Sequence, residues 1–148
     1  YLLRKQSFPF TLGWHPYFTS SNLKQSSLQF SSNTKYTYDH EQILSGSVPL
    51  DIDMPFELGG MVLDDGYPLQ SQTICFTTPT YTMTLRCTSQ ENYLQLYTPE
   101  QPHSIAIEPM TGAANNFNNR IGLQQLDPAQ RYQTAWHITI NTTHTTII

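Results

Sequence analysis

Apolar and polar residues alternate one by one along several short segments of this chain of 148 residues. Between residues 81 and 87 the apolar members are Tyr81, Met83, Leu85 and Cys87, each separated from the next by Thr or Arg. Because successive side chains of a strand point to opposite faces, this pattern predicts a strand with one buried face. The same spacing recurs at Leu28 and Phe30, at Leu94 and Leu96, at Ile105 and Ile107, and at Trp136, Ile138 and Ile140.

No segment keeps apolar residues at helical spacing without an early Pro or Gly, so no long helix is expected. Short helical turns are expected only between Thr111 and Asn119. Pro, Gly, Asn and Asp separate the strand-like segments and predict turns between them. The sequence therefore predicts a single all-β domain over residues 1–148, either an antiparallel sandwich or a larger open antiparallel assembly.

The polar residues of the chain are mostly uncharged. Charged residues make up 12% of the sequence, against about 25% in typical soluble domains, which suits neutral polar ligands. The net charge is −4 and the basic residues are dispersed, so nucleic-acid binding is not expected. There is neither a long apolar run nor a signal-peptide pattern, so we expect no membrane association and a cytoplasmic protein. The sequon at residues 141–143 keeps a secreted or periplasmic location open.

The two cysteines, Cys75 and Cys87, lie in predicted strands and show none of the spacings of a metal site. We expect no metal site, and we interpret both as buried free thiols.

Three segments contain residues that could carry chemistry. In the first, Gly13-Trp14-His15-Pro16-Tyr17-Phe18, proline favours an extended backbone at His15. With an unperturbed pKa of about 6.5, a histidine can give or take a proton near neutral pH. A buried histidine bonded to a carbonyl is an equally good interpretation of these residues alone.

In the second segment, Asp64 and Asp65 precede Gly66 and Pro68, which predicts a turn, because short carboxylates bond nearby amides. A carboxylate there could also accept hydrogen bonds from sugar hydroxyls. In the third, Glu108 ends an alternating apolar strand, where a carboxylate is commonly solvated. It is the combination of a histidine, an aspartate and a glutamate among neutral polar residues that favours a sugar site.

These three segments, in this order, resemble the aldose 1-epimerase (galactose mutarotase-like) family. Residues 8–18, FPFTLGWHPYF, are similar to its His-Pro-Tyr-Phe segment, and residues 107–118, IEPMTGAANNFN, to the segment with its catalytic glutamate. Asp64 and Tyr67 fit its Asp-x-x-aromatic segment, which is the least specific of the three. The likeness continues through Gly122-Leu123 and Leu126-Asp127-Pro128 to Trp136-His137-Ile138, so it covers nearly the whole chain.

The resemblance implies the second half of a large antiparallel β supersandwich and the interconversion of the α and β anomers of a free hexose. Glu108 would be the general base at the C1 hydroxyl, and His15 the general acid at the ring oxygen. Asp64 would hold a sugar hydroxyl, with Asp65 as the alternative. No metal or organic cofactor is implied.

The chain departs from the family in two ways. Pro128-Ala129-Gln130 stands where the family has a turn of Pro-Gly-Glu type, so we expect a small local rearrangement there. Family members are about twice this long, and their first half supplies an Arg and a further His that nothing here matches. We interpret the remaining histidines as structural or exposed, and we expect a fragment or a truncated gene product, whose activity alone is open. These histidines are His40, His103, His137 and His144.

Three rival interpretations remain. In a non-catalytic carbohydrate-binding sandwich, Trp14 and Tyr17, which we also predict to contact the sugar in an epimerase, would stack on sugar faces. An epimerase of hexose 6-phosphates would need clustered cations, whereas Arg86, Arg120 and Arg131 are dispersed. The last is an all-β scaffold without catalytic function. The oligomeric state is open.

Overall fold

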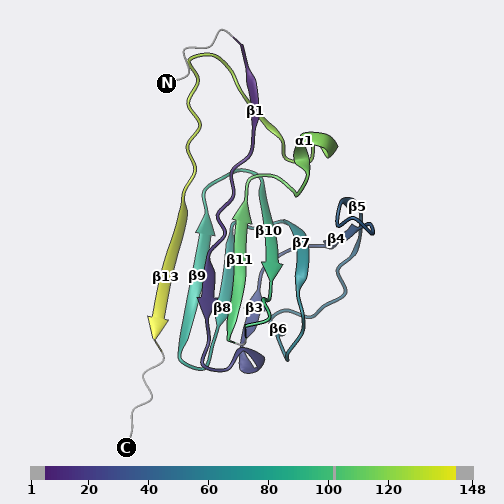
Figure 1. The fold of residues 1–148 in the computed structure, drawn as a ribbon. Helices are drawn as coiled ribbons and strands as arrows, with labels where there is room; N and C mark the ends of the chain where they lie inside the picture. The colour runs from purple at the N-terminus through teal and green to yellow at the C-terminus, as the bar shows by residue number, and fades with distance from the viewer. Residues whose placement is uncertain (1–5, 102, 143–148) are drawn as a thin grey trace, which may run out of the picture.

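β-Strands dominate the computed structural model, which describes residues 6–101 and 103–142 (Figure 1). The helical elements are the 3-10 helix η1 (Leu23–Gln25) and the one-turn helix α1 (Asn116–Asn119), which lies where helical turns were predicted. Among the described residues, no helix is long and apolar enough to cross a membrane. The strands are β1 (Phe8–Phe10), β2 (Tyr17–Thr19), β3 (Ser27–Gln29), β4 (Thr34–Tyr38), β5 (Leu44–Pro49), β6 (Phe56–Glu57), β7 (Asp64–Leu69), β8 (Thr73–Thr77), β9 (Tyr81–Cys87), β10 (Asn92–Tyr97), β11 (Ser104–Met110), β12 (Gln124–Leu126) and β13 (Trp136–Thr142).

Two sheets form the body of the fold, and every strand pairing in them is antiparallel. One has four strands in the order β2-β11-β10-β7, and the other has five in the order β13-β9-β8-β3-β6. Two further pairs, β1 with β12 and β4 with β5, lie outside them. The all-β antiparallel prediction is confirmed.

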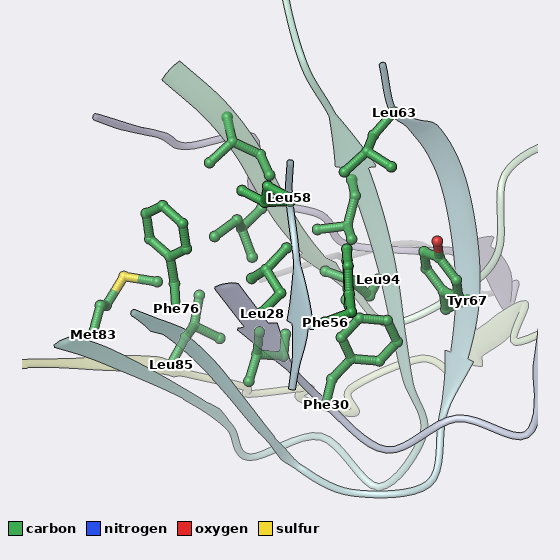
Figure 2. Close-up of a cluster of buried hydrophobic side chains, with 14 of the residues drawn as sticks. Leu28, Phe30, Phe56, Leu58, Leu63, Tyr67, Phe76, Met83, Leu85 and Leu94 are labelled. Carbon is green, nitrogen blue, oxygen red and sulfur yellow. The ribbon is translucent and has the colours of Figure 1, made fainter. Parts of the chain in front are cut away.

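The main hydrophobic core lies between these two sheets, and Figure 2 shows part of it. On β9, Met83, Leu85 and Cys87 are buried and Arg86 is exposed, as the alternation predicted. Ile140, near the end of edge strand β13, is the exception and is 56% exposed. Burying one large apolar side chain completely in this core stabilises the fold by about 1.5–3 kcal/mol. The fully buried members from both sheets include Leu28, Ile74, Phe76, Leu94, Leu96, Ile105 and Ile107.

The turn predicted at Asp64-Asp65-Gly66-Tyr67-Pro68 is wrong, because these residues form strand β7 and pair with β10. β7 is an edge strand, where a proline is tolerated because no further neighbour needs its missing N–H. Glycine in a strand often marks the close approach of another group, and a Cβ at Gly66 would collide with the Tyr38 hydroxyl. Alternation along β7 sends Asp64 and Asp65 to opposite faces of the sheet.

The outer face of the four-stranded sheet is partly covered by a second, smaller apolar cluster. Its buried members are Tyr36, Tyr93 and Ala113, with Tyr38 and Met110 packed against them. The hairpin formed by β4 and β5 lies beside edge strand β7 (Figure 1). It brings the tyrosines of β4 to this face. The part of this face that the cluster leaves uncovered carries polar residues, among them Glu108 and Gln95.

Both cysteines are free thiols, as predicted. Cys87 is buried, and burial raises its pKa to about 11, so it is protonated at neutral pH. Cys75 is only partly buried and lies 3.8 Å from the Thr84 hydroxyl, so the prediction that it is buried is correct only in part.

The turn that lacks the family's glycine keeps a left-handed backbone, with φ of 65° at Ala129. Two hydrogen bonds hold it: the Gln130 amide donates to the Asp127 carbonyl at 3.0 Å, and the Asp127 amide donates to the Gln130 side-chain oxygen at 3.1 Å. Alanine therefore occupies a conformation that favours glycine.

We expect Ala129→Gly to raise the free energy of unfolding by about 0.5–1 kcal/mol. A left-handed alanine costs about 1–2 kcal/mol, and the larger conformational entropy that glycine loses on folding offsets part of the gain from removing this strain. Ala135→Gly is the matched control, because the backbone there is not left-handed, and it should lose about 0.4–1 kcal/mol. Urea denaturation of both variants measures the difference. A loss of stability in both would contradict the strain at Ala129.

Candidate active site

Two prolines interrupt the pairing between β11 and the segment that leads into β2. The Trp14 amide donates to the Pro109 carbonyl at 3.1 Å, and the Ile107 amide donates to the Pro16 carbonyl at 3.3 Å. Proline has no N–H, so neither pair can make its second hydrogen bond. Both pairs keep the register that β2 and β11 share, and each is a hydrogen-bonded position of the ladder.

His15 and Glu108 lie opposite each other between these two positions. A pair flanked by hydrogen-bonded pairs is the kind in which the side chains approach most closely. His15 Nε2 lies 3.1 Å from Glu108 Oε1. The glutamate side chain is 12% exposed and the histidine side chain 55% exposed, so the pair has one sheltered member and one that reaches solvent.

Burial raises the pKa of the Glu108 carboxyl above its ordinary value. The nearby His15 opposes this rise in pKa, and the charge of Asp64 adds to it. A carboxylate with a raised pKa binds a proton more readily than an ordinary one. The arrangement therefore places a proton acceptor and a proton donor side by side on an accessible face.

Gln95 connects this pair to Asp64. Gln95 lies on β10, opposite Glu108 of β11 on one side and Gly66 of β7 on the other. His15, Glu108, Gln95 and Gly66 therefore form one row across the sheet. The Gln95 Nε2 group donates to Asp64 Oδ1 at 2.8 Å. Asp64 is exposed and lies on the same face as Glu108, so the structure brings His15, Glu108 and Asp64 together.

Tyr17 also lies on this face, with its ring centroid 5.1 Å from that of His15, and it is 50% exposed. It borders a groove of about 620 Å³ that continues along the sheet from the row of polar residues. The groove is lined by Tyr17, Thr19, Tyr97, Pro99, Glu100, Gln101 and Ser104.

Two residues considered from the sequence lie on the other face of the same sheet. Trp14 stacks on Trp136, with ring centroids 6.3 Å apart, because alternation turns it away from His15. Asp65 forms an ion pair with Lys35 at 2.8 Å and accepts a hydrogen bond from the Tyr67 hydroxyl at 3.5 Å. The structure does not bring Trp14 or Asp65 together with the acid–base pair.

Sequence reasoning missed Gln95 and Tyr38. Tyr38 on β4 donates its hydroxyl hydrogen to Gln95 Oε1 at 3.3 Å. The signal for Gln95 was a polar residue between Leu94 and Leu96, on the face of a strand that alternation turns away from the core. Nothing local marks Tyr38, because it reaches the site from a separate hairpin.

The other histidines lie away from this row. His40, His103 and His137 are exposed, in line with the sequence interpretation, and His144 lies outside the described residues. Within residues 6–101 and 103–142, no group of three or more His, Cys, Asp or Glu side chains is arranged to hold a metal ion.

A family model described as aldose 1-epimerase matches residues 2–139. No curated protein matches the chain.

Two solved structures share the fold. The Slr1438 protein of Synechocystis sp. PCC 6803 superposes with a TM-score of 0.79 at 21% identity, covering 95% of this chain and 48% of that one. A protein of Escherichia coli K12 named "Putative aldose 1-epimerase" has a TM-score of 0.78 at 14% identity, covering 95% of this chain and 53% of that one. The chain thus spans about half the length of these structures, and they support the predicted type of β supersandwich.

Proposed function

The chain belongs to the aldose 1-epimerase family, and we propose that it carries the acid–base pair of a mutarotase that interconverts the α and β anomers of a free hexose. The observation that carries this proposal is the 3.1 Å approach of His15 Nε2 to Glu108 Oε1 on an accessible sheet face. Ring opening requires one group to remove a proton and another to supply one. A carboxylate beside an imidazole provides both.

Glu108 removes the proton from the C1 hydroxyl, and His15 protonates the ring oxygen as the C1–O5 bond breaks. The open-chain aldehyde then rotates about its C1–C2 bond. On closure, C5 hydroxyl oxygen attacks the other face of the aldehyde, and the two proton transfers run in reverse. No proton or electron is gained or lost overall, so the scheme needs no redox cofactor.

The partial burial of Glu108 supports its role as the base. Its pKa is raised, and a base works best when its pKa approaches the working pH. His15 Nε2 and Glu108 Oε1 lie 3.1 Å apart. A bound sugar would place its C1 hydroxyl and ring oxygen between or beside the two groups.

Polarimetry of freshly dissolved α-D-glucose and α-D-galactose, with and without the chain, tests this function directly. We expect first-order acceleration proportional to protein concentration. Sugar binding without acceleration would favour the other candidate, a carbohydrate-binding sandwich, which the exposed Tyr17 and the adjoining groove could serve. Isothermal titration calorimetry with the same sugars shows whether a chain that does not accelerate mutarotation still binds them.

An unphosphorylated sugar fits this face better than a hexose 6-phosphate. The face carries the carboxylates Asp64 and Glu108, whose charge repels a phosphate dianion. Lys35, on the neighbouring strand β4, is paired with Asp65 on the other side of β7. Mutarotation of glucose 6-phosphate faster than that of glucose would contradict this preference.

Asp64 is proposed to accept a hydrogen bond from a sugar hydroxyl. We expect Asp64→Asn to raise KM about 10- to 100-fold with little change in kcat, because a hydrogen bond to a charged group is worth about 1.5–3 kcal/mol. Asp51→Asn is the matched control: it makes the same change at an exposed position outside both main sheets, so its KM should change by less than about two-fold. Equal effects of the two variants would remove Asp64 from the site.

A further inference from the structure

The β4–β5 hairpin contacts edge strand β7 on both of its faces. On one face Lys35 Nζ lies 2.8 Å from Asp65 Oδ1. On the other, the Tyr38 hydroxyl lies against Gly66 and reaches Gln95 on the next strand. The two contacts hold β4 in place beside the row of polar residues.

Gly66 makes this approach possible. A Cβ at this position would collide with the Tyr38 hydroxyl, and it would lie 3.0 Å from Gln95 Oε1 and 3.1 Å from Tyr36 Cδ2. Any side chain at 66 would therefore displace the tyrosine. The glycine in a strand that otherwise alternates has a specific function, which is to leave room for the phenol.

The hydrogen bonds in this region form a directed chain. Tyr38 donates to Gln95 Oε1 at 3.3 Å, and Gln95 Nε2 donates to Asp64 Oδ1 at 2.8 Å. If the carboxamide were reversed, its oxygen would face the carboxylate, and two acceptors would repel each other. Asp64 keeps its second oxygen, Oδ2, for which the described residues supply no recorded hydrogen bond.

Tyr38 remains a donor throughout the working pH range. Burial raises its pKa to about 12, and the charges of Asp64 and Asp65 and the nearby Tyr36 add to the rise. A neutral phenol donates one hydrogen bond, and here the acceptor is the Gln95 oxygen.

We infer that Tyr38 is a positioning residue of the sugar site. Its hydroxyl fixes the Gln95 carboxamide, which in turn holds Asp64 with Oδ2 free for a sugar hydroxyl. This role rests on the proposed function, since it needs Asp64 to bind the substrate. The hairpin thereby forms one wall of the site, and a change in β4 alters how tightly the sugar is held.

The test compares Tyr38→Phe with Tyr36→Phe in the mutarotation assay. Tyr36 is buried two residues away on the same strand, so its variant makes the same chemical change. Within the described part of the chain, the tyrosine that donates to Gln95 is Tyr38, so Tyr36→Phe removes no hydrogen bond to Gln95. We expect Tyr38→Phe to raise KM about 3- to 10-fold with kcat within about two-fold, the effect of losing one neutral hydrogen bond. Tyr36→Phe should leave KM within about two-fold.

A double variant separates positioning from general loosening of the fold. If Tyr38 acts through Gln95, Tyr38→Phe has no further effect on KM in a Gln95→Ala background. Gly66→Ala, which displaces the ring but keeps its hydroxyl, should raise KM as Tyr38→Phe does. Additive effects of Tyr38→Phe and Gln95→Ala on the free energy of substrate binding would overturn the inference.

The outcomes also distinguish this inference from the function on which it rests. Turnover by the parent with equal KM in both tyrosine variants overturns the role of Tyr38 alone. No turnover by the parent contradicts the proposed function. In that case the side-chain amide NMR signal of Gln95 still gives a result: a shift in Tyr38→Phe and none in Tyr36→Phe supports the positioning contact, and no shift overturns it.

Discussion

Glu108→Gln is expected to lower kcat for mutarotation by about 10²–10⁴-fold, the usual contribution of a positioned general base. Glutamine keeps the shape of the side chain and an oxygen that can face His15, but it cannot take the proton from the C1 hydroxyl. Since substrate contacts are otherwise kept, KM should change little. The measurement is polarimetry at several protein concentrations, with the spontaneous rate of the sugar subtracted.

Glu57→Gln is the matched control for this variant. It makes the same change of charge at an exposed position of β6, in the sheet that does not carry the acid–base pair, and its kcat should equal that of the parent. A Glu108→Gln variant that turns over at the parental rate would remove Glu108 as the base.

Glu108→Gln should not destabilise the fold at neutral pH. The folded-state pKa of Glu108 is raised above its ordinary value, which we take for the unfolded chain. Between these two values the folded chain binds more protons than the unfolded chain, so Glu108 lowers stability as pH rises through that window. Above it the ionised carboxylate is a net cost that glutamine does not carry. Loss of activity with unchanged or higher stability would identify the effect as catalytic.

The strands could be predicted from the sequence because their faces differ so strongly. The alternation in β9 gave its two ends and its buried face correctly, since one side faces the core. At β7 the local chemistry was misleading: Asp, Gly and Pro favour turns in most contexts, but here the segment pairs with β10 at the sheet edge and Gly66 leaves room for the Tyr38 hydroxyl. A pattern of residues along the chain cannot show that a separate hairpin will cover a glycine.

The candidate site divides in the same way. His15 and Glu108 belong to segments with recognisable residue patterns, and they face each other because the register of β2 and β11 continues through both segments. Trp14 was predicted to contact the sugar as an aromatic ring that could stack on it, whereas alternation sends it to the opposite face. Gln95 became visible only when three strands were placed side by side.

His15→Ala is expected to lower kcat by about 10²–10⁴-fold, because the ring oxygen then lacks its proton donor. It should also change the pH dependence in a definite direction. His15 lowers the pKa of Glu108, so its removal raises that pKa further, and the acid limb of kcat/KM moves to higher pH. Asp64→Asn removes a charge that raises the pKa, so its acid limb moves to lower pH.

These opposite shifts test the coupling of the pair more sharply than the loss of rate does. The exposed His137 on β13 provides the control, and His137→Ala should leave both kcat and the acid limb unchanged. If His15 and Glu108 act as one unit, the double variant should be scarcely slower than either single variant, because each change alone already stops the concerted transfer. Multiplicative losses with an unmoved acid limb would mean that the two residues act independently, and that the 3.1 Å contact is not the catalytic arrangement.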